Sequence, residues 1–152
     1  MKPSIIVQQA TIEKLDAVSK LFNEYRIFYN QKSDLEGARS FLFDRFEHRD
    51  SIIFIAIETE NNHTVGFIQL YPTFSSISMK RSFILNDLYV RDEYRKRGIA
   101  EKLLEAAKSY AYQTKAKGIG LETAINNDIA QRLYVNNGYK KNQDYYLYYL
   151  DL

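Results

Sequence analysis

The stretch that most constrains the fold of this chain runs from Val90 to Ala100, with the sequence VRDEYRKRGIA. The run before it, from Phe83 to Val90, is rich in β-branched and aromatic residues and predicts a buried strand. After Gly98, apolar residues recur at helical spacing and predict an amphipathic helix. The chain must therefore pass from a strand to a helix through a short loop with four cationic side chains, Arg91, Arg95, Lys96 and Arg97.

This loop has the properties of a phosphate-binding site. The first N–H groups of a helix lack intrahelical partners and the helix dipole is positive there, so backbone amides can bind phosphate oxygens alongside the cations. Gly98 lets a ligand approach the backbone closely because it has no Cβ. Taken alone, the pattern is better explained as a solvated basic turn. The chain has no G-x-x-x-x-G-K-[ST] and no G-x-G-x-x-G after a predicted strand, which argues against a P-loop nucleotidase and a dinucleotide fold.

Hydrophobic periodicity and turn residues predict the remaining elements. Strands are predicted over 4–9, 51–57, 64–74, 81–90 and 118–125, and one or two more over 139–150. Helices are predicted over 33–48, 98–116 and 127–137, and a first helix is predicted from a cap at Thr11 to about Tyr29. Pro72 suggests a sheet edge or a distortion near the end of its strand. This order of elements predicts a mixed α/β fold.

Composition limits the function. The length of 152 residues, without a Pro-, Gly- or Ser-rich linker, suits one domain. A net charge of only +2 gives no case for binding nucleic acid or a membrane. The lack of cysteine excludes disulfides, thiolate metal sites and a cysteine nucleophile. Because no apolar run is long enough to span a bilayer or to form a leader segment, we expect a cytoplasmic protein.

Two segments resemble motifs of the GCN5-related N-acetyltransferase (GNAT) superfamily. The run Arg95-x-x-Gly98-x-Ala100 is similar to the [QR]-x-x-G-x-[GA] loop that binds the acyl-CoA pyrophosphate in that family. Residues 127–139, NDIAQRLYVNNGY, match the family's N-x-x-A-x-x-x-Y-x-x-x-G-[FY] segment at every marked position. Two motifs in the right order are more specific than one. The resemblance implies a single N-acetyltransferase domain over 1–152, with a mostly antiparallel central sheet of about six to seven strands flanked by four helices.

The resemblance also implies an activity, the transfer of an acetyl group from acetyl-CoA to a primary amine of a small molecule or peptide. Direct attack in a ternary complex is implied, without a metal. In the family, backbone groups at the strand end bind the pantetheine arm and loop amides hold the pyrophosphate. The residues implied for acetyl-CoA binding are Leu88, Tyr89, Val90, Arg95, Lys96, Arg97, Gly98, Ile99, Ala100, Asn127 and Tyr134. Leu88 and Val90 are also compatible with plain core packing. Asn127 is also compatible with a role as the N-cap of a helix.

The candidate catalytic groups are Tyr134, Asp87 and Asn86. The resemblance points to the positions of Tyr134 and Asn86, and Asp87 is the nearest carboxylate on the same strand. A phenol with a pKa of about 10 stays protonated at neutral pH, so Tyr134 is the implied general acid for the departing thiolate, unless it is one more packing tyrosine. Some family members carry Glu at the position of Asn86, and an Asn there can orient water but cannot usefully accept its proton. Asp87 could bind a cationic amine or relay its proton, or equally make a structural bond near a strand bulge.

For the acceptor amine we expect contributions from Tyr25, Tyr29, Asp87 and Glu122. Tyr25 and Tyr29 share one helical face, as in similar Tyr-Arg-x-Phe-Tyr segments of one branch of the superfamily, although an aromatic core stripe explains them as well. Glu122, in the next predicted strand, is a second candidate carboxylate. The Asn at position 86 leaves one alternative open, a non-catalytic acyl-CoA-binding or regulatory domain. The tyrosine-rich C-terminal segment is a candidate homodimer interface.

Overall fold

The structure is a computed structural model that describes residues 4–152. The chain divides into two compact units, Met1–Glu122 and Thr123–Leu152, and each is described by itself. The elements follow in the order β1 (Ile5–Gln9), η1 (Ile12–Lys14), α1 (Leu15–Phe28), α2 (Leu35–His48), β2 (Ile52–Glu58), β3 (His63–Ser75), β4 (Lys80–Val90), η2 (Asp92–Tyr94), α3 (Ile99–Gln113), β5 (Ile119–Gly120) and α4 (Asp128–Asn136). Within the described residues, every helix is too short or too polar to cross a membrane.

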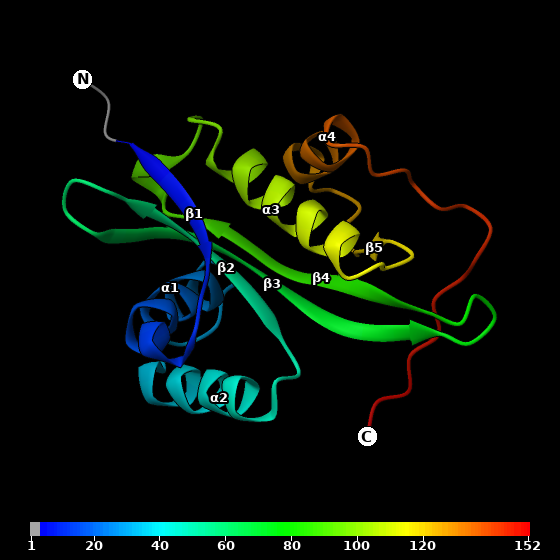
Figure 1. Cartoon of the computed structure of the whole chain (residues 1–152), viewed down its shortest axis with the longest axis horizontal. Coiled ribbons are helices and arrows are strands. Elements are labelled where there is room, and N and C mark those ends of the chain that lie inside the picture. The colour runs from blue at the N-terminus through cyan, green and yellow to red at the C-terminus, as the bar shows by residue number, and fades with distance from the viewer. Residues whose placement is uncertain (1–3) are drawn as a thin grey trace. The chain divides into compact units, whose positions relative to one another are not determined.

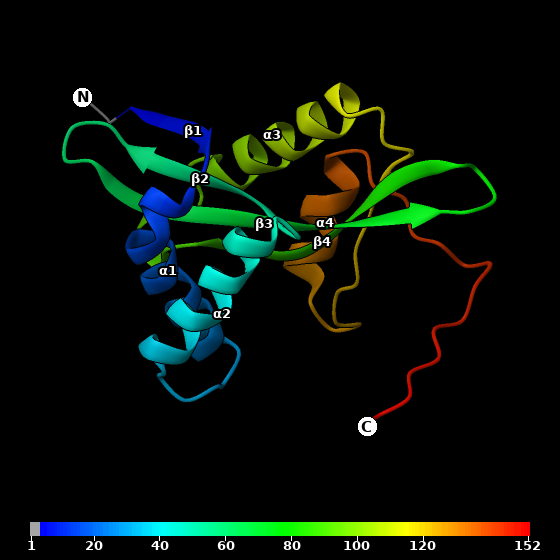
Figure 2. The same ribbon diagram turned by 60° about the horizontal axis from the view of Figure 1, so that its bottom comes forward.

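The first unit is built on one sheet with helices on both faces. Strands β1 to β5 lie side by side in chain order; the first four are antiparallel and β5 runs parallel to β4. Helices α1 and α2 cover one face, and α3 covers the other (Figures 1 and 2). This arrangement confirms the predicted mixed, mostly antiparallel α/β fold.

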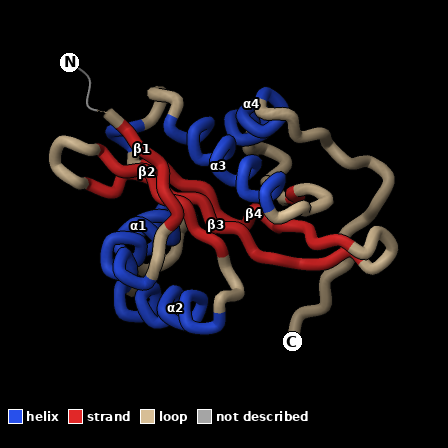
Figure 3. The backbone as a smooth tube through the Cα atoms, viewed as in Figure 1, coloured by secondary structure: helices blue, strands red, loops and turns tan. Residues whose placement is uncertain are grey.

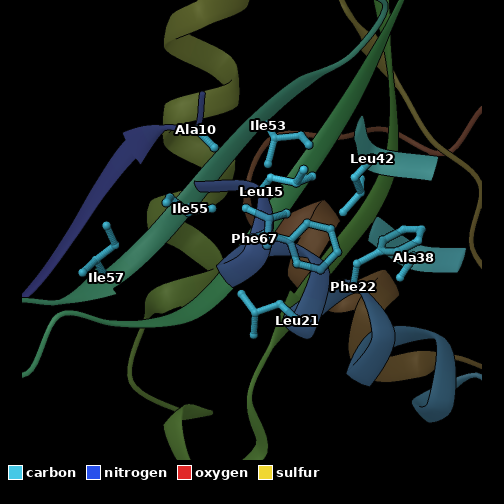
Figure 4. Close-up of a cluster of buried hydrophobic side chains, with 11 residues drawn as sticks. Ala10, Leu15, Leu21, Phe22, Ala38, Leu42, Ile53, Ile55, Ile57 and Phe67 are labelled. Carbon is cyan, nitrogen blue, oxygen red and sulfur yellow. The ribbon is translucent and has the colours of Figure 1, made fainter. Parts of the chain in front are cut away.

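The core of this unit lies between the sheet and the α1 and α2 layer (Figure 4). Its buried side chains are Ala10, Leu15, Val18, Leu21, Phe22, Ala38, Leu42, Ile53, Ile55, Ile57 and Phe67. The helical residues recur at a spacing of three or four, and the β2 residues alternate, so each element turns one apolar stripe inward. On the opposite face, Phe54 of β2 packs edge-on against Tyr110 of α3 at 5.8 Å. Removal of this apolar area from water is the main favourable term in folding.

Pro72 lies in β3 where one side of that strand has no neighbouring strand among the described residues. The pairing of β2 with β3 ends at Ile52 and Leu70. Beyond Leu70, β3 pairs with β4 alone among the described strands. A proline, which cannot donate a ladder hydrogen bond, is tolerated at such an edge. The expectation of a sheet edge at this residue is confirmed.

Two expectations about strands were wrong. The described residues form five strands rather than six or seven, because residues 139–150 add none; in addition, β5 contains only Ile119–Gly120 of the predicted 118–125. Residues 139–150, which were expected to add the last one or two strands, are loop (Figure 3). The side chains of the tyrosines in 145–149 are 81–90% exposed. Alternation indicates which face of a strand is apolar, but a strand also needs a neighbour with available backbone groups, and none is paired with this segment in the part of the chain described.

Candidate active site

The site begins at a bulge in β4. Opposite β3, Gln69 pairs with Asp87 while Leu70 pairs with Leu85, so Asn86 is an extra residue in β4. An extra residue breaks the alternation of side chains along a strand. The bulge thereby brings the side chain of Asp87 to the face that carries Gln69 and that α1 covers. A bulge near this position was expected from the sequence.

Asp87 is only 3% exposed, yet three donors surround its carboxylate. Gln69 Nε2 donates to Oδ2 at 2.5 Å, Asn86 Nδ2 donates to Oδ1 at 3.1 Å, and the Tyr25 hydroxyl makes a further hydrogen bond. Burial raises the pKa of Asp87; the three hydrogen bonds lower it but leave it above its ordinary value. A buried carboxylate with a raised pKa is suited to hold or accept a proton.

Aromatic side chains of α1 pack over this part of the sheet. The centroid of the Tyr25 ring lies 5.1 Å from that of Tyr29, 5.7 Å from that of Phe67 and 6.1 Å from that of Tyr89. We call these four residues the aromatic wall. Tyr25 packs against the core, as the alternative of an aromatic core stripe predicted, and its hydroxyl also contacts Asp87. Tyr29 is 51% exposed at the surface of the wall.

A hollow of about 330 Å³ opens beside the aromatic wall. It is lined by Glu24, Ile27, Phe28, Tyr89, Arg91, Asp92 and Glu93. The expected acceptor residues Tyr25 and Tyr29 do not line it; their neighbours on α1 do. Three carboxylates against one guanidinium among the lining residues favour a cationic ligand over an anionic one.

Three of the four cationic side chains in the loop make contacts within the protein: Arg91, Arg95 and Arg97, whose guanidinium lies 5.2 Å from the centroid of the Tyr94 ring. Arg91 donates two hydrogen bonds to Glu24 of α1, at 2.8 and 3.2 Å. Arg95 Nε donates to the carbonyl of Val90 at 2.9 Å, and its guanidinium lies over two aromatic rings at 4.9 and 5.6 Å. These contacts fix the end of β4 against α1. Lys96 and Arg97 are the exposed cations of the loop.

The backbone of the loop offers a run of unused donors. In the described part of the chain, the N–H groups from Lys96 to Glu101 donate to no protein acceptor. Lys96 and Gly98 have positive φ angles of 62° and 77°. Residues of this conformation between ordinary ones gather N–H groups into an anion-binding concavity, and here the positive end of α3 adds to it. We call the N–H groups from Lys96 to Glu101 the amide cradle. These donors suit the several oxygens of a pyrophosphate. Ile99 and Ala100 would contribute only their backbone N–H groups to such a ligand.

An open edge of β4 leads directly into the cradle. β5 pairs with β4 only at Phe83 and Ile84. From Leu85 to Val90, the side of β4 away from β3 has no partner strand among the described residues. A ligand with amide groups can pair with such an edge as an added strand would. The expected binding residues Leu88, Tyr89 and Val90 lie on this segment.

In the second unit, Asn127 is the N-cap of α4. Its Oδ1 accepts a hydrogen bond from the backbone N–H of Ala130 at 3.1 Å. The N-cap role that the sequence suggested is therefore present. Glu122, at the end of the first unit, is exposed and lies outside every strand, so the predicted strand position of this carboxylate was wrong.

The other end of α4 explains the spacing of the second motif. The N–H of Tyr139 donates to the carbonyl of Tyr134, and the N–H of Gly138 donates to that of Val135, at 3.0 and 3.1 Å. Gly138 has a φ of 94°, and the rings of Tyr134 and Tyr139 meet edge-on at 5.7 Å. These are the two hydrogen bonds, the left-handed residue and the apolar contact of a Schellman cap. The Y-x-x-x-G-Y spacing is thus a helix C-terminus as well as a motif.

The structure brings together Tyr25, Asn86 and Asp87 of the predicted site. The sequence analysis did not find Gln69, whose side chain is fully buried. A single glutamine within the apolar run GFIQLY is the only sequence signal for it. Among the described residues, no group of three or more His, Cys, Asp and Glu side chains is placed to hold a metal ion.

Comparisons with known proteins agree with this architecture. A family model described as Acetyltransferase (GNAT) family matches residues 15–139. The protein named "Uncharacterized N-acetyltransferase YhfO" from Bacillus subtilis (strain 168) is 47% identical over 146 residues, which are 96% of this chain and 97% of that protein. The crystal structure of a probable acetyltransferase superposes with a TM-score of 0.93 at 40% identity, covering 97% of each chain.

A more distant likeness shows the fold alone. Aminoglycoside N-acetyltransferase AAC(6')-Iy, in complex with CoA, has a TM-score of 0.81 at 15% identity and covers 100% of this chain and 98% of that one. The fold and the family match define an enzyme that transfers an acetyl group to an amine. The chain belongs to the acetyltransferase (GNAT) family.

Proposed function

We propose that the chain transfers an acetyl group from acetyl-CoA to a primary amine of a small molecule or peptide, by direct attack in a ternary complex within one N-acetyltransferase domain. The observation that carries this proposal is the amide cradle, Lys96 to Glu101, directly after the open edge of β4. A pyrophosphate needs many donors, and a pantetheine arm carries amide groups that can pair with a strand edge. The CoA complex of a protein with the same fold supports this donor.

The residues proposed to bind acetyl-CoA divide by the chemistry that they offer. Leu88, Tyr89 and Val90 provide backbone groups on the open edge, and Gly98, Ile99 and Ala100 provide backbone N–H groups. Lys96 and Arg97 add positive charge to their own N–H groups. Arg95 is proposed to contribute indirectly, because its side chain donates to the Val90 carbonyl and so fixes the end of β4. Asn127 and Tyr134 of α4 are proposed contacts to the pantetheine arm and the thioester sulfur.

Asp87 is the proposed base, with Asn86 orienting the amine or a water beside it. An alkyl ammonium with a pKa of about 10 is neutral in only about a thousandth of molecules at pH 7, so removal of its proton assists attack. The amine nitrogen forms a bond to the acetyl carbon while the carbon–sulfur bond breaks. Asp87 takes one proton from the ammonium before attack, and Tyr134 donates a proton to the departing sulfur. The second proton that nitrogen loses as the amide forms restores the Tyr134 phenol, and Asp87 then releases its proton to water. The raised pKa of Asp87 supports this role, because a poised carboxylate transfers protons more readily than a fully ionised one.

The proposed acceptor is a cationic amine. Tyr25 and Tyr29 of the aromatic wall, together with Asp87, offer ring faces and a carboxylate, which are the groups that bind ammonium ions. The adjoining hollow with its three carboxylates supports the same class. Glu122, our second candidate, has no hydrogen bond or ion pair in the described structure that supports such a role.

An amine panel tests donor and acceptor together. The purified chain is incubated with acetyl-CoA and alkyl amines, amino acids, aminoglycosides and peptides, and products are identified by mass spectrometry. We expect acetylation of at least one cationic amine together with release of CoA. Calorimetric binding of acetyl-CoA without turnover of any amine would instead support a non-catalytic acyl-CoA-binding domain.

A further inference from the structure

Gln69 is fully buried in β3 and makes a hydrogen bond at each end of its amide. Ser51, immediately before β2, donates from Oγ to Gln69 Oε1 at 2.7 Å. Gln69 Nε2 donates to Asp87 Oδ2 at 2.5 Å. A line of hydrogen bonds therefore crosses the sheet from the start of β2 to the bulge of β4.

The chemistry of the three groups sets the direction of this line. An ionised carboxylate only accepts hydrogen bonds, so Gln69 must present its NH₂ group to Asp87. The carbonyl oxygen of the same amide then faces Ser51, whose hydroxyl must donate. The Ser51 hydroxyl thereby stabilises one orientation of the amide against the flipped one, in which two acceptors would face each other.

We propose that Ser51 and Gln69 are positioning residues for Asp87, and that they hold its carboxylate ionised and oriented toward the acceptor amine. Neither residue contacts the substrate in this account. The inference rests on the proposed role of Asp87 as the base. Donation to the ionised form favours that form, so loss of either donor should let Asp87 keep its proton to higher pH.

Other titratable groups also surround Asp87. Tyr25 of α1 donates a hydrogen bond to Asp87. The pKa of Tyr71 in β3 is raised to about 12, mainly by burial of its hydroxyl and next by the nearby charge of Asp87. Arg45 of α2 lowers the pKa of Tyr71 and Asp50, just after α2, raises it. These two side chains form an ion pair, with Nε and Oδ1 3.4 Å apart. Ser51, Gln69 and Asn86 are the members of this surrounding that do not titrate. Their replacement changes hydrogen bonding to Asp87 without changing any charge near it.

The test compares Ser51→Ala and Gln69→Met with the wild type in two measurements. The titration of the Asp87 carboxyl is followed by carbon-13 NMR without substrate, and kcat/KM for the acceptor is measured against pH. We expect the Asp87 titration and the acid limb of kcat/KM to move together to higher pH in both variants. At pH 7 we expect a roughly tenfold loss of kcat/KM in Gln69→Met, since hydrogen bonds to charged groups are the stronger ones.

Two controls separate positioning from general destabilisation. Ser51→Thr keeps a hydroxyl and should restore the wild-type profile. Ser82→Ala removes a serine hydroxyl that donates to the Gly118 carbonyl at 3.1 Å elsewhere in the sheet, and should leave the profile unchanged. Because Ser51 is only partly buried, Ser51→Ala is expected to fold even if Gln69→Met does not.

The two measurements distinguish failure of this inference from failure of the proposed function. An unchanged Asp87 titration in the folded variants would overturn the positioning role. A shifted titration with an unmoved acid limb would support positioning and would overturn the role of Asp87 as the base.

Discussion

At the scale of single residues, structural roles and motif positions coincide. Asn127 caps the start of α4, and Tyr134, Gly138 and Tyr139 form the Schellman cap at its end. The helix alone would favour these residue types at this spacing. The spacing alone therefore does not prove that Tyr134 is an acid. Only a change confined to the phenol oxygen tests that role.

Tyr134→Phe removes the hydroxyl and keeps the ring that packs on Tyr139. We expect kcat to fall roughly 100-fold or more, which is the usual contribution of a general acid, while the melting temperature changes little. Steady-state kinetics and a thermal melt measure the two effects. Tyr139→Phe is the matched control, because it deletes a phenol oxygen from the same ring pair and should keep kcat. Full activity of Tyr134→Phe would show that the acid assignment is wrong.

Asp87→Asn removes a carboxylate whose pKa burial raises. The folded state binds this proton more tightly than the unfolded chain, so the wild type loses stability as pH rises through the raised pKa and gains it as pH falls toward the ordinary value near 3.9. We therefore expect the variant to be more stable than the wild type at pH 7, with Asn86 turning its amide to pair with the new side chain.

Urea unfolding at about pH 7 and about pH 4.5 measures this difference, which should shrink at the lower pH. A variant less stable than the wild type at both values would contradict the expected cost of the buried charge. Greater stability with lost activity is the trade-off expected of a strained active site.

At the scale of elements, the sequence predicted what depends on local pattern. Helix spacing in α1 and α3, the strand and helix on either side of the loop, and a bulge beside Asp87 are all present. Gln69 was missed because one of its partners precedes β2 and the other lies in β4, so no local pattern contains them. The strand over 139–150 was wrong for a related reason, since strand formation depends on a neighbour that the segment's own residues do not specify.

Gly98→Ala tests whether the backbone conformation of the amide cradle is needed to bind acetyl-CoA. A side chain at a φ of 77° costs about 1–2 kcal/mol, although the added Cβ would meet no atom closer than 4.0 Å. The loop should relax away from this conformation, and we expect the Kd for acetyl-CoA to rise roughly tenfold with a small change in stability. Gly118→Ala is the control, because nothing lies within 4 Å of its added Cβ and its φ is not positive. Calorimetry that finds equal affinity in both variants would contradict the cradle.

At the scale of the whole molecule, the family match over residues 15–139 runs through both compact units. The proposed donor site is the open edge of β4 with the cradle, and the proposed acceptor site is the aromatic wall with Asp87 on the face covered by α1. Cysteine is absent from the chain, so a thiol cannot carry the acetyl group between them. The central claim is that both substrates are bound at once and react directly.

Initial rates with acetyl-CoA and the best amine varied together test that claim most directly. The account predicts double-reciprocal lines that intersect, and no acetylated protein by mass spectrometry when acetyl-CoA is supplied without amine. Parallel lines together with an isolable acetyl-enzyme would contradict it.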